Sequence, residues 1–584
     1  MRSKNTLFTI SIILLASLSS FAQTEVSYKE MMENNSYNFY EVVDAANAYF
    51  DANGRTKGSG WKNFERWKAE NESKFYPSGD RSNVDFYGVT KTYTEIANQA
   101  HNLKNKASFT DGWVELGPWS ANNITSHYSP GIGRVQDFWV NPNNTNQMYI
   151  ASSTGGFWKS NNGGNTWQNT TDFLPAAGVF TFDVNPNNTN EILIAVCQGG
   201  FLYTHGIYRS TDAGATWTVS NFGPANLGWG GLGSNVRITK LRYHPTVANQ
   251  VFVGTSLGLF VSTDNLDTWQ SKFGGNVTDV AFHPTNTDVI YVYNNAGTDR
   301  NFIKISTDGG ANFNNVGEFP NNSNSQIYIS TSPAEPNHVY AASTKNVYKS
   351  TDQGNSFVAL SNPDETCLAF SVSDLNVNNM IYGYVDLQAS TDGGNTFTRT
   401  TSWSNQNSAY IHADMQIANC INGVFYVATD GYFAKSTDNG FTWTKLNDGT
   451  GIRDFYAVGT SQGDYSVHMP GSQDNGTSIL NKDGWIEWNG GDGMEALVHP
   501  LNQKWMIGSW QYGTRSHTRD GGQSRNGAEN PENGSSNAYW EAPLLLNPQN
   551  QMQVLHFANS IYRGDKFGTE WSYKSTPGIN TIFD

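Results

Sequence analysis

A short part of the second half of the chain brings together side chains that could carry out chemistry. His412 and Asp414 stand in YIHADMQ, Asp430 in ATDGYF, Asp474 in GSQDNGT and Asp492 in NGGDGMEAL. A pair of carboxylates could cleave a glycosidic bond if one acted as general acid and the other as nucleophile or base. The same oxygen atoms, with the histidine nearby, could instead bind Ca²⁺ or another divalent ion. In the plainest alternative the carboxylates only cap the loop amides around them.

Residue type assigns a role to each member of this region. Asp474 and Asp492 are the predicted catalytic pair of a hydrolase. The predicted ligand-binding residues are Arg134, His412, Asp414, Asp430, Gln473, Asn475, Trp403 and Trp488. The two tryptophans could stack on sugar rings or on a peptide, provided that they stand exposed, and packing between structural units is the alternative for each. No metal ligand is assigned, and the sequence predicts no cofactor beyond the Ca²⁺ alternative.

A sequence repeat indicates which strands and turns position these residues. Close copies of one turn recur along the chain: SNNGGNTW from Ser160, STDAGATW from Ser210, STDNLDTW from Ser262, STDGGANF from Ser306, STDQGNSF from Ser350, STDGGNTF from Ser390 and STDNGFTW from Ser436. Successive copies are 40 to 52 residues apart, which is the period of a four-stranded propeller blade. The 57 glycines and the low share of charged residues, 15%, also suit short strands joined by tight turns.

Each copy of the turn is expected to close a hairpin. The Asp side chain accepts hydrogen bonds from backbone amides further along, glycine supplies a positive φ, and the closing aromatic ring packs against the sheet. We therefore assign a structural role, rather than metal binding, to the repeated aspartates Asp212, Asp264, Asp308, Asp352, Asp392 and Asp438.

A proline bend precedes each turn. Segments such as VTDVAFHPTNTDVIYVYN pass from one β-type stretch through His-Pro or Asn-Pro to another. Because proline cannot donate to a β-ladder, it marks the bend between the first and second strands of a blade. Three degenerate turns, GTSILNKDGW, SHTRDGGQS and YRGDKFGTEW, bring the predicted count to ten blades. Loops of such blades alternate between two faces, so the candidate carboxylates are expected on the face opposite the repeated turns.

The repeated turn resembles the Asp-box, or BNR repeat, of propellers in sialidases, sortilin-type receptors and family 74 xyloglucanases. The resemblance covers about residues 113–584. It implies an all-β Asp-box propeller, either one ten-bladed ring as in sortilin or a seven-bladed propeller plus part of a second as in family 74. Since these relatives differ in activity, the motif implies the fold rather than the function. The final INTIFD resembles the first strand of a further blade, so we expect the chain to be truncated at its C-terminus.

The resemblance also bears on catalysis. Sialidases carry an arginine triad and an FRIP-like motif, whereas this chain has no FRIP and offers Arg134 alone. Family 74 enzymes place one catalytic Asp before the Gly-Gly of the first blade, where this chain has Ser153. They place the other in a Gly-Asp segment, which Asp492 loosely matches. Loss of one carboxylate argues against an ordinary glycosidase mechanism unless Asp430 or Asp474 replaces it.

The N-terminal part differs from the repeats. Residues 1–22 combine Arg2 and Lys4 with an apolar run and small residues before a cut, as a secretory signal peptide does. Residues 23–112 contain YNFYEVVDAANAYFDANG, WKNFERWKAENESKFYP and TYTEIANQAHNLKN, whose apolar spacing predicts a helical arm on the propeller. A separate recognition helix is the alternative. The signal and the repeat array together resemble exported proteins of gliding bacteria that use type IX secretion.

Charge and hydropathy narrow the range of partners. The net charge of −15 argues against nucleic acid, and no later apolar run is long enough to span a bilayer. We expect a secreted protein, extracellular or at the cell surface, that binds polysaccharide or protein through the face opposite the Asp-boxes. A glycoside hydrolase of family 74 type is the alternative, and a non-catalytic adhesion or structural protein is the third hypothesis.

Overall fold

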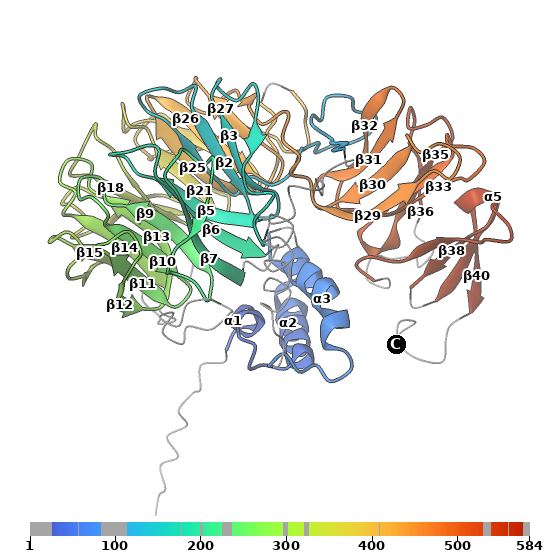
Figure 1. The fold of residues 1–584 in the computed structure, drawn as a ribbon, viewed down its shortest axis with the longest axis horizontal. Helices are drawn as coiled ribbons and strands as arrows, with labels where there is room; N and C mark the ends of the chain where they lie inside the picture. The colour runs from blue at the N-terminus through green and yellow to red at the C-terminus, as the bar shows by residue number, and fades with distance from the viewer. Residues whose placement is uncertain are drawn as a thin grey trace, which may run out of the picture.

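The computed structural model describes residues 26–56, 58–82, 114–176, 178–198, 203–224, 236–295, 302–319, 326–407, 409–529, 539–558 and 560–575 (Figure 1). Within them, the helices α1 (Tyr28–Glu33), α2 (Phe39–Asn53) and α3 (Trp61–Phe75) precede ten antiparallel sheets, each built from four consecutive strands. This confirms an all-β propeller fold with a short helical part at its N-terminal end. The predicted signal peptide, the TYTEIANQAHNLKN segment of the arm and the final INTIFD lie outside the described residues.

The blades follow one another in chain order. Blades one to five are β1 (Asp137–Val140), β2 (Met148–Ser152), β3 (Gly156–Ser160), β4 (Gln168–Asn169); β5 (Gly178–Val184), β6 (Ile192–Gln198), β7 (Tyr203–Ser210), β8 (Thr218–Val219); β9 (Ile238–Tyr243), β10 (Val251–Thr255), β11 (Gly258–Ser262), β12 (Gln270–Gly274); β13 (Asn276–Phe282), β14 (Ile290–Asn295), β15 (Phe302–Ser306), β16 (Asn314–Glu318); and β17 (Tyr328–Thr331), β18 (Val339–Ser343), β19 (Asn346–Ser350), β20 (Val358–Ser361). Blades six to ten are β21 (Ala369–Val372), β22 (Met380–Gly383), β23 (Leu387–Ser390), β24 (Thr398–Arg399); β25 (Met415–Ile421), β26 (Val424–Thr429), β27 (Phe433–Ser436), β28 (Thr444–Lys445); β29 (Phe455–Thr460), β30 (His468–Ser472), β31 (Gly476–Asn481), β32 (Gly484–Asn489); β33 (Gly493–Val498), β34 (Met506–Trp510), β35 (Arg515–Thr518), β36 (Asn526–Glu529); and β37 (Leu544–Leu546), β38 (Val554–Phe557), β39 (Ile561–Gly564), β40 (Glu570–Ser575). Two short helical turns, η3 (Gln511–Gly513) and α5 (Asp565–Gly568), lie in blades nine and ten.

The turn between the third and fourth strands has the hydrogen bonding that the repeated motif predicts. In blade two, Gly214 N donates to Ser210 Oγ at 2.8 Å, while Thr216 donates through N and Oγ1 to the two carboxylate oxygens of Asp212 at 2.9 and 2.6 Å. Gly214 has a φ of +77°, which a larger residue adopts only with strain. The closing Trp217 packs edge-on against an aromatic ring of blade one, with centroids 5.3 Å apart. Each turn therefore closes a hairpin and adds to the packing between blades.

Two of these turns keep the geometry with other residues. In blade nine, Gly522 N donates to Thr518 Oγ1 at 3.0 Å, and Ser524 Oγ donates to Asp520 at 2.6 Å. The degenerate SHTRDGGQS is thus a complete turn with Thr in the place of Ser. In blade one, Asn162 Oδ1 accepts from the amide of residue 166 at 2.9 Å, as Asp does elsewhere.

Seven blades close into a ring, because the first strand of blade one lies against the first strand of blade seven. The two blades share one hydrophobic core that includes Phe138, Ile150, Tyr426 and Phe433, and the rings of Phe138 and Phe433 are 5.0 Å apart. The predicted alternative of a single ten-bladed, sortilin-like ring is therefore wrong. The arrangement that forms is a seven-bladed ring followed by three blades of a second propeller (Figure 1).

The three C-terminal blades pack in sequence, with β29 on β33 and β33 on β37. The segment before blade one joins them to the ring. Thr125 N donates to Glu487 O at 2.9 Å, and Glu487 N donates to Asn123 O at 2.7 Å, so this segment extends the sheet beyond β32. At the same place Arg453 and Glu487 form a fully buried ion pair at 3.1 Å. This junction holds the cleft between the two propellers in a defined geometry.

The helices α1–α3 form a unit of their own, which we call the helical arm. Capping boxes begin α1 at Ser27 and α2 at Asn38. The apolar side chains of the arm pack on one another in a core formed by Tyr28, Phe39, Val42, Ala46, Phe50, Phe64, Trp67 and Phe75. In Figure 1 the arm lies between the ring and the C-terminal blades. None of the described helices is both long and apolar enough to cross a bilayer.

Candidate functional site

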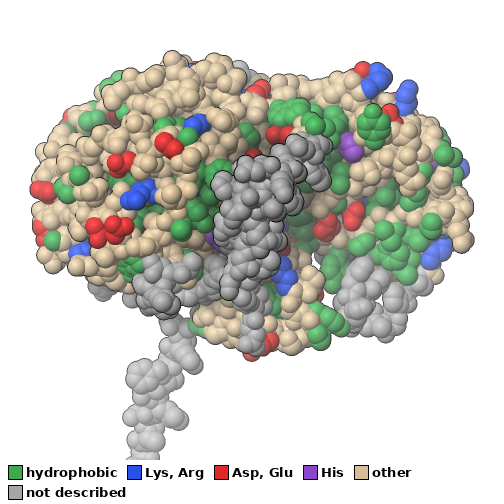
Figure 2. Space-filling model, viewed as in Figure 1, with side chains coloured by type: hydrophobic (Ala, Val, Ile, Leu, Met, Phe, Trp, Pro, Cys, Tyr) green, Lys and Arg blue, Asp and Glu red, His purple; other side chains and the backbone are tan. Residues whose placement is uncertain are grey.

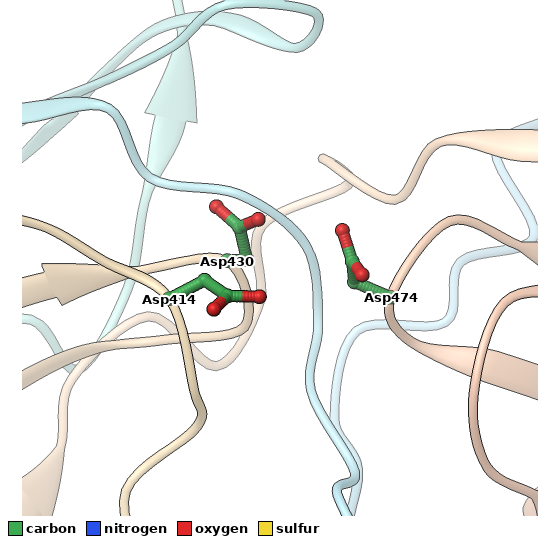
Figure 3. A group of neighbouring side chains, drawn as sticks. All are labelled: Asp414, Asp430 and Asp474. Carbon is green, nitrogen blue, oxygen red and sulfur yellow. The ribbon is translucent and has the colours of Figure 1, made fainter. Parts of the chain in front are cut away.

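Loops at one end of the blades bring three of the predicted carboxylates together. Asp414 directly precedes β25, Asp430 lies between β26 and β27, and Asp474 lies between β30 and β31. Their ligand oxygens all lie within 4.8 Å of one another, around one point between the loops (Figure 3). The Asp-box turns join third to fourth strands at the other end of each blade. The carboxylate cluster therefore occupies the face opposite those turns.

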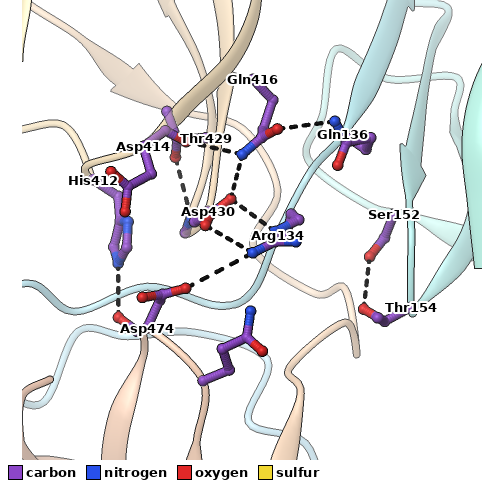
Figure 4. Close-up of polar contacts among 12 residues, drawn as sticks. Arg134, Gln136, Ser152, Thr154, His412, Asp414, Gln416, Thr429, Asp430 and Asp474 are labelled. Atoms are coloured by element: carbon purple, nitrogen blue, oxygen red, sulfur yellow. Dashed lines mark hydrogen bonds and ion pairs between the residues drawn. The ribbon is translucent and has the colours of Figure 1, made fainter. Parts of the chain in front are cut away.

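Arg134, in the loop before β1, is the cation of this cluster (Figure 4). Its Nε and Nη2 donate to the two carboxylate oxygens of Asp430 at 2.8 and 3.0 Å, and Nη2 lies 3.8 Å from Asp474 Oδ2. Gln416 Nε2 also donates to Asp430, at 2.7 Å. Asp414 and Asp474 have φ values of +63° and +55°, an uncommon conformation that clusters at functional sites. Since the guanidinium of Arg134 pairs with Asp430 and lies near Asp474, the donor set favours Arg134 over Ca²⁺ as the counter-ion of Asp430.

The electrostatic environment gives two of the carboxylates different pKa values. Burial, together with the charges of Asp474 and Asp414, raises the pKa of Asp430 to about 6 and outweighs the opposite effect of Arg134. Burial also acts to raise the pKa of Asp474, but neighbouring cations, Arg66 above all, hold that pKa well below its ordinary value. One carboxyl group therefore takes up a proton in weakly acidic solution while its neighbour stays ionised. Such a difference in pKa between two neighbouring carboxyl groups suits general acid–base chemistry.

Two cations of α3 reach this region, and the sequence analysis did not include them among the site residues. Lys62 Nζ lies 2.6 Å from Asp492 Oδ2, while Arg66 Nη2 lies 2.6 Å from Asp474 Oδ1 and also contacts Asp492. The backbone amide of Asp474 donates to Asp492 Oδ1 at 3.1 Å, so the predicted catalytic pair is adjacent. The four-residue spacing in WKNFERWK does place both cations on one helical face. That spacing does not indicate which carboxylates this face of the helix contacts.

His412 and Asn475 are buried and hydrogen-bond to the loops, and His412 also lines the cavity described below, so direct ligand contact stays a prediction for both. His412 Nε2 lies 3.2 Å from the carbonyl oxygen of Asp474, and burial lowers the pKa of the ring, which favours the neutral form. Asn475 Nδ2 donates to the carbonyl oxygens of Asp430 and Gln473 at 3.0 and 2.9 Å. Both side chains therefore position the turns that carry the carboxylates. Gln473 itself lines the cavity described below.

The two tryptophans predicted to bind ligand differ in their exposure to solvent. Trp488 has no exposed surface: its ring lies in a core shared by blades eight and nine, and its Nε1 donates to the carbonyl oxygen of Ser524 at 3.0 Å. It does not meet the condition of exposure, so its assignment to ligand binding is wrong. Trp403 lies at the rim of the cleft, edge-on to Tyr128 with ring centroids 5.5 Å apart. Tyr128 is 43% exposed and is an aromatic that the sequence analysis missed, because its local sequence does not distinguish it.

A cavity of about 1570 Å³ lies between the helical arm and these loops. Its lining is mixed in chemistry and includes Trp61, Tyr128, Trp403, Asp430, Gln473 and Tyr512. Charged side chains are sparse over the face of the molecule in Figure 2, where uncharged polar groups and backbone predominate. The carboxylates and cations of the cleft are a local concentration of charge.

The fold and the cleft define a class of protein: a propeller in which a seven-bladed ring and further blades flank a carboxylate-bearing cleft. No protein-family model and no curated protein matches this sequence. Among solved structures, the chain is similar to the GH74 xyloglucanase from Xanthomonas campestris, with 14% identity, a TM-score of 0.58, and coverage of 77% of this chain and 74% of that one. For the GH74 enzyme from Niastella koreensis the values are 17%, 0.57, 79% and 75%. At these identities the similarity shows a family 74-like fold and nothing finer.

Proposed function

We propose that this protein is secreted and binds polysaccharide in the cleft between the seven-bladed ring and the C-terminal blades. The observation that carries the proposal is the aromatic rim of Trp403 and Tyr128 beside a large cavity that also contains carboxylate and amide groups. Sugar rings stack on aromatic faces while nearby polar groups bind their hydroxyls. The fold shared with xyloglucanases supports a glycan ligand by analogy.

The aromatic rim is formed before any ligand arrives. A Cβ atom at Gly490 would lie 2.5 Å from the ring of Tyr128, so this ring packs directly on the backbone there. The adjacent His127 is buried, and its Nε2 lies 2.8 Å from the carbonyl oxygen of Asn475. Because the rim is fixed to the same loop that carries the carboxylates, binding costs little ordering entropy.

Affinity electrophoresis on plant, algal and animal polysaccharides tests this proposal. We expect Trp403→Ala to bind the preferred polysaccharide about tenfold more weakly, because a stacking surface is lost. Tyr465→Ala is the matched control, since this tyrosine is 92% exposed in the turn between β29 and β30, on the opposite face. Equal weakening in the control would contradict the proposal. So would no retention, on any polysaccharide, of either the wild-type protein or a variant in which both α3 cations at the cleft, Lys62 and Arg66, are replaced by Gln.

A glycoside hydrolase is the second candidate, favoured by the separated pKa values of Asp430 and Asp474. Asp430 would protonate the leaving group and Asp474 would act as the ionised partner. Oxygens of the two lie within 4.8 Å, closer to the roughly 5–5.5 Å of retaining enzymes than to the roughly 6.5–9.5 Å of inverting ones. Ser153 in blade one is fully buried and supplies no carboxylate.

Release of reducing sugar from the same polysaccharides tests the second candidate. We expect Asp430→Asn and Asp474→Asn to lower the rate by about a thousandfold, and the Asp-box variant Asp392→Asn to leave it unchanged. Absence of release from every substrate by the wild-type protein and by the variant Lys62→Gln combined with Arg66→Gln, which removes the cations that pair with Asp474 and Asp492, rules out hydrolysis of those substrates. Binding without release leaves the first proposal in place.

A further inference from the structure

We propose that the helical arm is an internal mask of the cleft, which must leave before a polysaccharide chain can enter. The inference rests on the proposed binding function and concerns the regulation of that same site. It starts from the position of α3, whose first two turns carry Trp61, Lys62 and Arg66 into the cleft. These three side chains meet the groups that a ligand would need.

The contacts of the arm satisfy the carboxylates. Lys62 binds Asp492 at 2.6 Å, and Arg66 binds Asp474 at 2.6 Å and also contacts Asp492. The Arg66 side chain is only 12% exposed, and that of Asp492 is fully buried. A ligand hydroxyl therefore cannot reach the carboxylate of Asp492 while α3 is in place, and only 8% of the Asp474 side chain is exposed.

Aromatic residues at the cleft are covered in the same way. Trp61 Nε1 donates to the hydroxyl of Tyr512 at 2.7 Å. The guanidinium of Arg66 lies over the ring of Trp540 at 5.9 Å, and Lys68 Nζ lies over the ring of Tyr539 at 6.0 Å. The arm thus presents cations and one indole ring to a surface of carboxylates and aromatic rings.

The arm is built to move as one body. Its hydrophobic core contains only residues of the arm. Among the described residues, ion pairs, a hydrogen bond and cation–π contacts join the arm to the blades. Arg81 joins its two ends, donating to Met31 O at 2.9 Å and to Asn35 Oδ1 at 3.1 Å. A unit with its own core and a polar interface can separate without exposing a large apolar surface.

A further ion pair holds the far side of the arm. Glu33, at the end of α1, pairs with Arg237 of blade three at 2.5 Å. The arm therefore contacts the ring at blade three and the C-terminal blades through Asp474 and Asp492, so it spans the cleft. Removing either set of charges should weaken the docking.

The experiment uses the full chain and three variants. Lys62→Gln combined with Arg66→Gln removes the cations from the cleft, and Arg237→Gln removes only the distant ion pair and leaves all cleft carboxylates in their wild-type surroundings. Lys74→Gln is the control, because Lys74 pairs with Glu70 of the same helix at 3.1 Å and both side chains are exposed. Carbodiimide with glycine ethyl ester labels accessible carboxylates at Asp474 and Asp492, and affinity electrophoresis measures polysaccharide binding by the same samples.

We expect labelling of Asp474 and Asp492 to rise at least fivefold in the double variant, less in Arg237→Gln, and not at all in the control. Polysaccharide affinity should rise about tenfold in the double variant, because a closed population no longer competes with the ligand. Equal labelling in all four proteins would overturn the mask. Increased labelling with equally tight binding by the wild-type protein would overturn it too, and would leave the binding function intact. Increased labelling with no binding by any of the four would refute the binding function and the mask together.

Discussion

Aspartates at the two ends of the blades differ in where their partners come from. In the Asp-box turns, each side chain is held by residues within four positions of itself, as Asp392 is by Ser390 and by the amide and hydroxyl of Thr396. In the cleft, Asp430 pairs with Arg134 across 296 positions, and Asp474 pairs with Arg66 across 408. The first kind is a local structural device that needs only its own turn. The second exists only after distant segments have met.

The difference also appears in protonation. Hydrogen bonds from the side chain and backbone of Thr396 lower the pKa of Asp392 to about 2 at an exposed position. Burial raises the pKa of Asp430 to about 6 despite a bidentate arginine. Exposed, locally bonded carboxylates therefore stay ionised, whereas a crowded and buried carboxylate becomes a proton donor near the pH of weakly acidic surroundings.

The largest effect is expected from Asp430→Ala, which leaves the guanidinium of Arg134 without its bidentate partner in a largely buried site. We expect the free energy of unfolding to fall by about 3–5 kcal/mol, measured by urea denaturation. Replacing both Arg134 and Asp430 with Met should cost less than removing Asp430 alone, because neither member of the pair is then left as a buried charge without its partner. If the double replacement were the more damaging of the two, the pair would be a net source of stability.

A smaller effect is expected on how the free energy of unfolding depends on pH. Because the pKa of Asp430 is about 6 in the folded protein and its ordinary value is 3.8, the folded state binds more protons between these values. Its contribution to stability is therefore complete below pH 4 and is lost as pH rises through 6, a change on the order of 3 kcal/mol.

Urea midpoints at pH 4, 5, 6 and 7 measure this dependence. The decline between pH 4 and 7 should be shallower in Asp430→Asn than in the wild-type protein. Asp392→Asn should not alter this window, since the lowered pKa of Asp392 acts only below pH 4. Parallel curves for wild type and Asp430→Asn would contradict the raised pKa.

Removal of one Asp-box side chain should matter less. In Asp392→Ala the amide and hydroxyl of Thr396 lose their acceptor at an exposed turn, where water replaces it in part. We expect a loss of about 1 kcal/mol in the free energy of unfolding. A loss as large as that of Asp430→Ala would show that the turn is coupled to the packing between blades.

The smallest effect is expected for Asp392→Asn, at no more than about 0.5 kcal/mol at pH 7. Blade one already uses Asn162 at this position, where Oδ1 accepts from the amide of residue 166 and Nδ2 donates to Thr166 Oγ1 at 2.8 Å. Thermal unfolding of the variant beside the wild-type protein measures the difference. A large loss would mean that the negative charge, and not the hydrogen-bond geometry, stabilises the turn.

Much of the blade structure could be predicted because its determinants are local. Ser210, Asp212 and Gly214 bond one another within one turn, so their spacing alone indicates a hairpin. The site could be predicted only in part. The expected carboxylates do gather, but Trp488 and His412 proved to be buried, because local sequence does not reveal which side of a ring is covered by a neighbouring blade.

The sequence by itself determined the strands, the turns and the repeat of ten blades, since each depends on hydrogen bonds and side-chain alternation within a few residues. Only the tertiary structure decided that the ring closes at seven blades, through the contact of Phe138 with Phe433. It alone also placed Lys62 and Arg66 against Asp474 and Asp492. The physical reason is that ring closure and ion pairing depend on how whole blades and helices pack. Because the repeats resemble one another, each blade has several possible neighbours until the chain has folded.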